Sequence, residues 1–172
     1  MSDVEMNSRP GLAGAAARLI TLWALLGGVL LLVVVIVNVV SVIGGVVWKP
    51  FPGDFELTEI GVAVAAFAFL PYCELIGGNV TADIFTARAG PRLIAFFKFL
   101  ASLMALIFAC ILLWRMYHGL LNQKDYNYTT AILQIPLWWG FVPILISLAL
   151  LAVAAGLSLR DSLHSFAEAK HA

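Results

Sequence analysis

The chain has 172 residues, of which 62% are hydrophobic and only 12% are charged, and its formal net charge is zero. A soluble domain is nearer half apolar and a quarter charged. Here the charges fall into short clusters between long apolar stretches, which is typical of an integral membrane protein. The balanced charge gives no basis for binding nucleic acid. No zinc-type Cys/His spacing, nucleotide-binding glycine loop or catalytic triad signature is present, so we expect no catalytic residue, cofactor or metal.

The first apolar stretch predicts a transmembrane helix over residues 17–47. It is far longer than the roughly 7–15 residues of a signal-peptide core, so we expect it to be retained. About 20 residues cross a bilayer, which leaves this helix room to tilt or to extend beyond the lipid. Asn38 and Ser41 lie in its middle. We expect the Asn amide to hydrogen-bond a neighbouring helix, and a role in transport is the alternative.

The next residues, 48–56 (WKPFPGDFE), contain two prolines and a glycine that end the first helix. Their aromatic side chains suit the lipid–water boundary, so these residues are compatible with a short interfacial helical segment that lies along the membrane surface. A second helix is predicted over 57–78, with Thr58 as its cap and Glu59 in its first turn, where the helix dipole favours an acid. The alanine-rich stretch 63–68 permits close packing against another helix.

A cluster of polar side chains follows and is expected to form a short cytoplasmic hairpin. Glu74 lies within about a turn of the membrane surface, where we expect it to cap the helix or to pair with Arg88 or Arg92. Ionisable groups inside membranes are costly and are candidates for function, so ion translocation is the alternative for Glu74. The polar residues of the cluster are Glu74, Asn79, Thr81, Asp83, Arg88 and Arg92.

A third helix is predicted over 91–117 and a fourth over 132–159, which makes the chain a single membrane domain over residues 1–172. The segment 115–131 is interpreted as a polar outer loop, and its His118 has no partner at metal-ligand spacing. Pro136 is placed in the first turns of the fourth helix, where a missing N–H matters least. The residues after 159 are expected to form a short amphipathic extension.

Four spans put both termini on the same side of the membrane, and the basic residues predict which side. One side carries seven of them and the other three, so the positive-inside rule places both termini and the hairpin in the cytoplasm. The seven are Arg9, Arg18, Arg88, Arg92, Lys98, Arg160 and Lys170, and the three are Lys49, Arg115 and Lys124.

The two cysteines lie at different predicted depths. Cys73 falls near the inner end of the second helix and Cys110 toward the outer end of the third. At about 1.5 Å per residue they differ in depth by roughly 20 Å, whereas a disulfide needs Cα atoms within about 7 Å. We therefore predict two free, buried thiols, which argues against a membrane enzyme or redox protein that would use both.

Two stretches, FELTEIGVAVAAFAFLPYCELIGGNVTADIF and TTAILQIPLWWGFVPI, resemble the small, DctQ-type membrane subunit of tripartite ATP-independent periplasmic (TRAP) transporters. That family tends to show a Glu at the start of helix two, a small-residue end, a hairpin with His or Asn followed by Asp, and a Thr…Ile-Pro-x-Trp start to helix four. The matching residues here are Glu59 (or Glu56), Gly77, Gly78, Asn79, Val80, Asp83, Thr130, Ile135, Pro136 and Trp138. Asn79 stands where many members carry His.

The resemblance implies an all-α integral membrane protein of the bacterial inner membrane, with four transmembrane helices and cytoplasmic N- and C-termini. Such subunits act as a scaffold for a large membrane subunit, which holds the substrate and sodium sites and moves as an elevator. A periplasmic substrate-binding protein delivers the substrate, commonly an organic acid, and membrane lipids surround the complex. No catalytic or ion-binding residue carries over. The residues expected to fix the hairpin and the partner interface are Glu59, Glu74, Asn79, Asp83, Arg88 and Arg92.

The alternative function is a self-associating channel or a stand-alone small transporter. Such a protein needs polar groups that line a shared axis through the membrane. The available candidates, Asn38, Ser41, Glu74 and Ser102, are predicted to lie at different depths, so the sequence favours the scaffold subunit.

Overall fold

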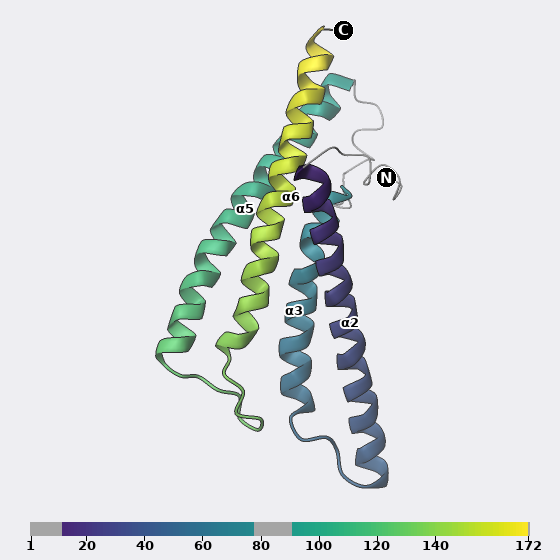
Figure 1. Ribbon diagram of the computed structural model, residues 1–172, viewed down its shortest axis with the longest axis vertical. Helices are drawn as coiled ribbons and strands as arrows, with labels where there is room; N and C mark the ends of the chain where they lie inside the picture. The colour runs from purple at the N-terminus through teal and green to yellow at the C-terminus, as the bar shows by residue number, and fades with distance from the viewer. Residues whose placement is uncertain (1–11, 78–90, 172) are drawn as a thin grey trace.

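The computed structural model describes residues 12–77 and 91–171, and it is helical throughout apart from short connections. In these residues four helices follow one another, α2 (Leu12–Val47), α3 (Asp54–Leu75), α5 (Pro91–Asp125) and α6 (Trp138–His171) (Figure 1). All four are long and apolar enough to cross a membrane. The predicted all-helical architecture with four membrane-length helices is therefore confirmed for the described residues.

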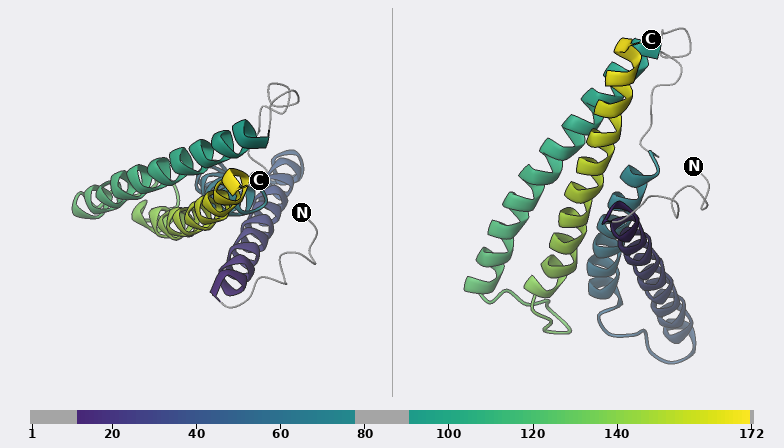
Figure 2. Two further views of the ribbon diagram at one scale, coloured as in Figure 1. Left: turned by 90° about the horizontal axis from the view of Figure 1, so that it is seen from above. Right: turned by 45° about the horizontal axis from the view of Figure 1, so that its top comes forward.

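The helices form an open row rather than a closed bundle. α3 packs between α2 and α6, and α5 packs on the other side of α6, so that α2 and α5 lie at opposite edges (Figures 1 and 2). In the most apolar stretch of each edge helix only 11% of the residues are buried, against 33% for α3 and 28% for α6. The two edge helices therefore leave most of their surface to lipid or to another protein.

Small residues let α2 and α3 approach each other closely. Ala65 and Ala68 of α3 are only 1% and 2% exposed. A Cβ added at Gly27 of α2 would lie 2.7 Å from the Cβ of Ala68, and one added at Gly61 would overlap the side chain of Val34. Because lipid is as apolar as a leucine side chain, helices in membranes associate through such close contacts. The close packing predicted from the alanine-rich stretch is confirmed.

An apolar cluster at mid-height joins all four helices. Val64 of α3 and Leu148 of α6 belong to it, and Leu30 of α2 and Leu113 and Met116 of α5 pack against it. A second cluster, with Ala17, Ile20, Leu75 and Ala154, lies where α2 begins and α3 ends. The mid-height cluster aligns the four helices with one another, so it shows which residues of α5 lie level with the middle of α2 and α3.

The start of α3 and the end of α5 differ from the predicted boundaries. α3 begins at Asp54. The preceding residue, Gly53, has a left-handed φ of 81°, and no side chain caps the start of the helix with a hydrogen bond. Thr58 therefore does not cap the helix; its hydroxyl donates to the carbonyl of Asp54 at 2.7 Å. α5 continues to Asp125, because the predicted loop begins with good helix formers that pack on α6. A Cβ added at Gly119 there would lie 3.0 Å from the ring of Phe141.

The last helix also begins later than predicted, at Trp138 instead of about residue 132, and Pro136 lies in the preceding loop. No helix forms in residues 48–53, so the interfacial helical segment allowed for there is absent. The residues after 159 continue α6 without interruption to His171, so the predicted extension is the end of a transmembrane-length helix.

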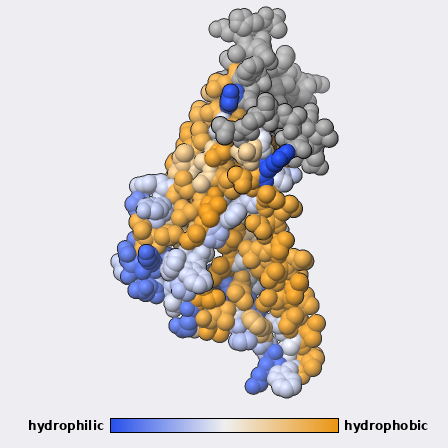
Figure 3. Space-filling view, viewed as in Figure 1, coloured by the Kyte–Doolittle hydropathy of each residue, from blue (hydrophilic) through white to orange (hydrophobic). Residues whose placement is uncertain are grey.

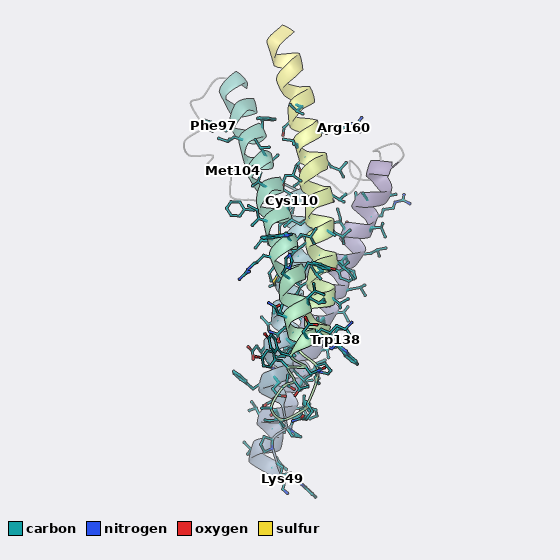
Figure 4. All side chains as sticks on the ribbon, turned by 90° about the vertical axis from the view of Figure 1, so that its left-hand side faces the viewer. Lys49, Phe97, Met104, Cys110, Trp138 and Arg160 are labelled. Carbon is teal, nitrogen blue, oxygen red and sulfur yellow. The ribbon has the colours of Figure 1, made fainter. Side chains whose placement is uncertain are left out.

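The prediction of free thiols is confirmed and that of their burial is wrong. Neither cysteine is in a disulfide, but Cys73 is only half-buried and Cys110 is exposed. Cys110 lies on α5, at the edge of the row (Figure 4), and none of the other three described helices covers its side chain.

Candidate functional site at the loop end

Two connections lie together at one end of the molecule, which we call the loop end. Residues 48–53 join α2 to α3, and residues 126–137 join α5 to α6 (Figure 1, lower side). Lys49 lies at the extremity of this end, beyond Trp138 at the start of α6 (Figure 4). The polar groups of this end hold the two connections in place.

Glu56, in the first turn of α3, ties the second connection to the first. Its side chain is 8% exposed. One carboxylate oxygen accepts a hydrogen bond from the backbone N–H of Ile132 at 2.6 Å, and the other accepts one from the N–H of Leu133 at 3.0 Å. Hydrogen bonds to a carboxylate are stronger than those between neutral groups, and buried amides need an acceptor. One side chain thus anchors a loop that lies more than seventy residues further along the chain.

The anchored loop has a compact internal structure built around Thr130. The N–H of Thr130 donates to the carbonyl of Ile135 at 2.9 Å, and the Thr130 hydroxyl accepts from the N–H of Ile135 at 3.0 Å. Thr129 and Pro136 form an isolated antiparallel bridge. Gln134 adopts a left-handed φ of 55°, which reverses the chain between the two arms. The Thr…Ile-Pro spacing is therefore the spacing of a tight, closed turn, not of a helix start.

Polar groups of α2 hold the other connection. Asn38 donates to the hydroxyl of Thr58 at 2.6 Å, so its predicted hydrogen bond to a neighbouring helix is confirmed. The hydroxyl of Ser41 donates to the carboxylate of Asp54 and accepts from the N–H of Phe51 at 3.1 Å. These bonds satisfy groups that would otherwise be unpaired in an apolar helix. They also fix the angle at which the chain enters α3.

The two connections touch directly at Gly53. A Cβ added at this glycine would overlap the side chain of Leu133, whose own N–H is bound by Glu56. The left-handed φ of Gly53 and the lack of space both exclude a larger residue. Gly53, Glu56 and the loop 130–136 therefore form one packed unit, which we call the loop clamp.

Of the predicted site residues, the structure describes Glu59 and Glu74 in full, and it places them near opposite ends of α3. The side chain of Glu59 is exposed and makes no hydrogen bond or ion pair within the described residues, whereas its alternative, Glu56, is part of the loop clamp. Glu74 is 6% exposed and lies at the opposite end, beside Leu75 of the second apolar cluster. Arg92 is in the first turn of α5, but its side chain lies outside the description, as do the whole of Asn79, Asp83 and Arg88. Their role in the hairpin stays a prediction.

Sequence reasoning missed the contact between Glu56 and residues 132–133, although both segments were singled out. Glu56 and Glu59 both lie within a few residues of the predicted helix start, and only the position of that start decides which one faces the loop. Within residues 12–77 and 91–171 no three His, Cys, Asp or Glu side chains are grouped as metal ligands. The polar groups described above bind backbone and hydroxyl groups of the chain itself.

These features define a small multi-pass membrane protein whose polar contacts organise its own connections. A family model described as "Tripartite ATP-independent periplasmic transporters, DctQ component" matches residues 42–164, which include the loop clamp. The chain belongs to this family of TRAP transporter components, which is a transporter family and not an enzyme family. No curated protein and no solved structure matched the chain.

Proposed function

We propose that this chain is the small scaffold subunit of a TRAP-type secondary transporter in a bacterial inner membrane. It pairs with the large elevator subunit for sodium-coupled, binding-protein-dependent uptake of an organic acid. The family match over residues 42–164 carries this proposal. The open row of helices supports it, because the largely uncovered edge helices leave room for a second membrane protein.

The alternative of a self-associating channel finds less support in the described residues. Asn38 and Ser41 are both hydrogen-bonded to α3. Ser102 of α5 is buried, and so is Glu74, which lies at the other end of α3. A shared polar axis would need such groups to be free and level with one another. Their engagement within the chain favours a structural role.

The proposed complex predicts a specific result on purification. A tagged chain, extracted from its native cells in a gentle detergent, is expected to bring down a larger multi-pass protein in a fixed ratio, identified by mass spectrometry. Deleting the chain is expected to abolish uptake of the substrate. The variants Asp83→Ala and Arg92→Ala should lower the yield of the complex if the 79–92 hairpin contributes to the interface. Recovery of the chain alone in several detergents, with flux through it in liposomes, would favour the channel instead.

We also propose that both termini are cytoplasmic and that the loop end faces the periplasm, as the distribution of basic residues indicates. With Cys73→Ser and Cys110→Ser as background, Tyr128→Cys is expected to react with an impermeant maleimide in cells whose outer membrane alone is permeable. Leu163→Cys, near the other end of α6, should react only after the inner membrane is opened. Both positions are more than half exposed. The opposite labelling pattern would invert the proposed orientation.

In that orientation, the loop clamp shapes the surface that the periplasmic binding protein meets. Glu74, Asn79, Asp83, Arg88 and Arg92 are proposed to fix the opposite end and, together with Glu59 near the start of α3, the contact with the large subunit. Membrane lipids fill the remaining surface of α2 and α5. The Glu56 substitution described in the Discussion tests the first of these roles, and the purification above tests the second.

A further inference from the structure

The outward face of α5 changes character along its length. Among the side chains of α5 that the structure describes, which begin at residue 97 and omit residue 98, the exposed ones are apolar as far as Ile111. Phe97 and Met104 are among them (Figure 4). From Arg115 onward the same face is polar, and Figure 3 shows the hydrophilic surface gathered over the end of α5, at the left of the view. Spacings of three and four residues place these side chains on one side of a helix. We call this set the α5 polar stripe: Arg115, His118, Asn122 and Asp125, all exposed.

The stripe has few partners within the part of the chain that the structure describes. The ring of His118 stacks edge-on against Trp114, with centroids 5.0 Å apart, and against Tyr117 at 6.0 Å. These aromatic contacts hold the imidazole in place at the surface. The guanidinium of Arg115 makes neither a hydrogen bond nor an ion pair in residues 12–77 and 91–171. Its charge is compensated by no described group of this chain.

The position of Arg115 between the two ends of the helices indicates where its charge lies relative to the membrane. Arg115 lies between Leu113 and Met116, and both of those pack on the mid-height cluster with Leu30 and Val64. Leu30 is in the middle of the apolar span Gly14–Val47, and Val64 is in the middle of α3. A hydrocarbon core of about 30 Å covers about ten residues of helix on either side of that level. Arg115 is therefore level with helices whose outward faces are wholly apolar.

A charged group at that height needs a compensating partner, because hydrocarbon offers none. A single arginine can reach toward the membrane surface, but here polar residues continue for three turns along one face. A phospholipid phosphate lies at the membrane surface, above the level of the mid-height cluster. An acidic side chain from a neighbouring membrane helix can reach this level and form a bidentate ion pair with arginine.

We infer that the α5 polar stripe is a contact surface for the large membrane subunit, and that Arg115 pairs there with a carboxylate of that subunit. The inference rests on the proposed function and names one edge of the row as the interface. The polar side chains of the stripe then provide the specificity of the contact, since a wrongly placed partner would leave the Arg115 charge unpaired. The apolar part of α5 provides contact area for the same partner.

Charge reversal tests the inference in the complete complex. Arg115→Glu is expected to lower the yield of large subunit recovered with the tagged chain by about tenfold or more, because it sets two negative charges against each other. Lys124→Glu is the matched control, since Lys124 is an exposed base of the same helix that lies about 130° around it from the stripe. The control is expected to leave the yield unchanged. Reversing the partner carboxylate to arginine should restore the complex with Arg115→Glu.

A second measurement keeps the test valid if Arg115→Glu fails to insert. In a Cys73→Ser, Cys110→Ser background, His118→Cys and Asn122→Cys are expected to be protected from maleimide in the complex and reactive in the isolated chain. Crosslinking from these positions identifies the partner carboxylate. Equal reactivity in both states would overturn the inference, as would a complex that retains its full yield with Arg115→Glu while losing bound anionic phospholipid. If the wild-type chain recovers no large subunit, the proposed function fails instead.

Discussion

Replacement of Glu56 by glutamine is expected to release the 126–137 loop while leaving the four helices assembled. Glutamine has nearly the same shape but only one acceptor oxygen, and its amide presents N–H donors where the second oxygen stood. One of the two amides, that of Ile132 or that of Leu133, would then face a donor. Hydrogen exchange of a peptide covering this loop should accelerate by about tenfold or more, since exchange follows local opening.

Glu59→Gln is the matched control, because it makes the same chemical change one turn further along α3 at an exposed position. We expect it to leave hydrogen exchange in the loop unchanged, whereas Glu56→Gln should accelerate that exchange and lower uptake. If both variants exchange at the wild-type rate, the carboxylate of Glu56 does not hold the loop. If Glu56→Gln opens the loop and uptake is unaffected, the loop clamp is not part of the surface that meets the binding protein.

Replacement of Gly27 by leucine is expected to separate α2 from α3. The added Cβ alone would lie 2.7 Å from the Cβ of Ala68, and the closest contacts involve the backbone-proximal atoms of both helices. Overpacking of this kind typically costs about 1–3 kcal/mol. The thermal unfolding midpoint of the purified protein should fall, and the yield of the complex should fall with it.

The neighbouring glycine provides the control, because a Cβ at Gly28 would meet nothing within 4 Å. Gly28→Leu changes helix propensity by the same amount as Gly27→Leu, so the difference between the two midpoints reports packing alone. The pair Gly27→Ala and Ala68→Gly moves the methyl group across the interface and should recover much of the midpoint that Gly27→Ala alone loses. Equal midpoints for Gly27→Leu and Gly28→Leu would contradict the observed approach of the helices.

The residues that carried the family resemblance proved to be in contact, although the sequence does not reveal the contact. The Thr…Ile-Pro motif was interpreted as the beginning of a helix, yet it forms a closed turn whose amides are bound by Glu56. Helix propensity and proline position are local properties, and both agree with a helix start at residue 132. The carboxylate of Glu56, which is distant in the sequence, instead stabilises a non-helical turn at residues 132–133. Helix propensity alone does not favour that turn.

A similar contrast holds for α5. Its predicted end at residue 117 followed from the polarity of the next residues, which suits a loop outside the membrane. The helix instead continues to Asp125 along α6, because the packing of Gly119 against Phe141 supports a polar sequence in helical form. That continuation puts Arg115 ten residues before the end of α5 instead of at its predicted end, and the packing of Leu113 and Met116 places it at mid-height, which is the basis of the proposed interface.

The amino-acid sequence by itself determined that this is a helical membrane protein with four apolar helices, and its motifs indicated the DctQ type. Length and apolarity are sufficient for the four helices, because a segment in lipid has to satisfy its backbone hydrogen bonds internally. Only the tertiary structure decided between Glu56 and Glu59, placed Pro136 in a turn and left Cys110 exposed at the edge of an open row. Each of these depends on which helix faces which, and that is settled by contacts between residues far apart in the chain.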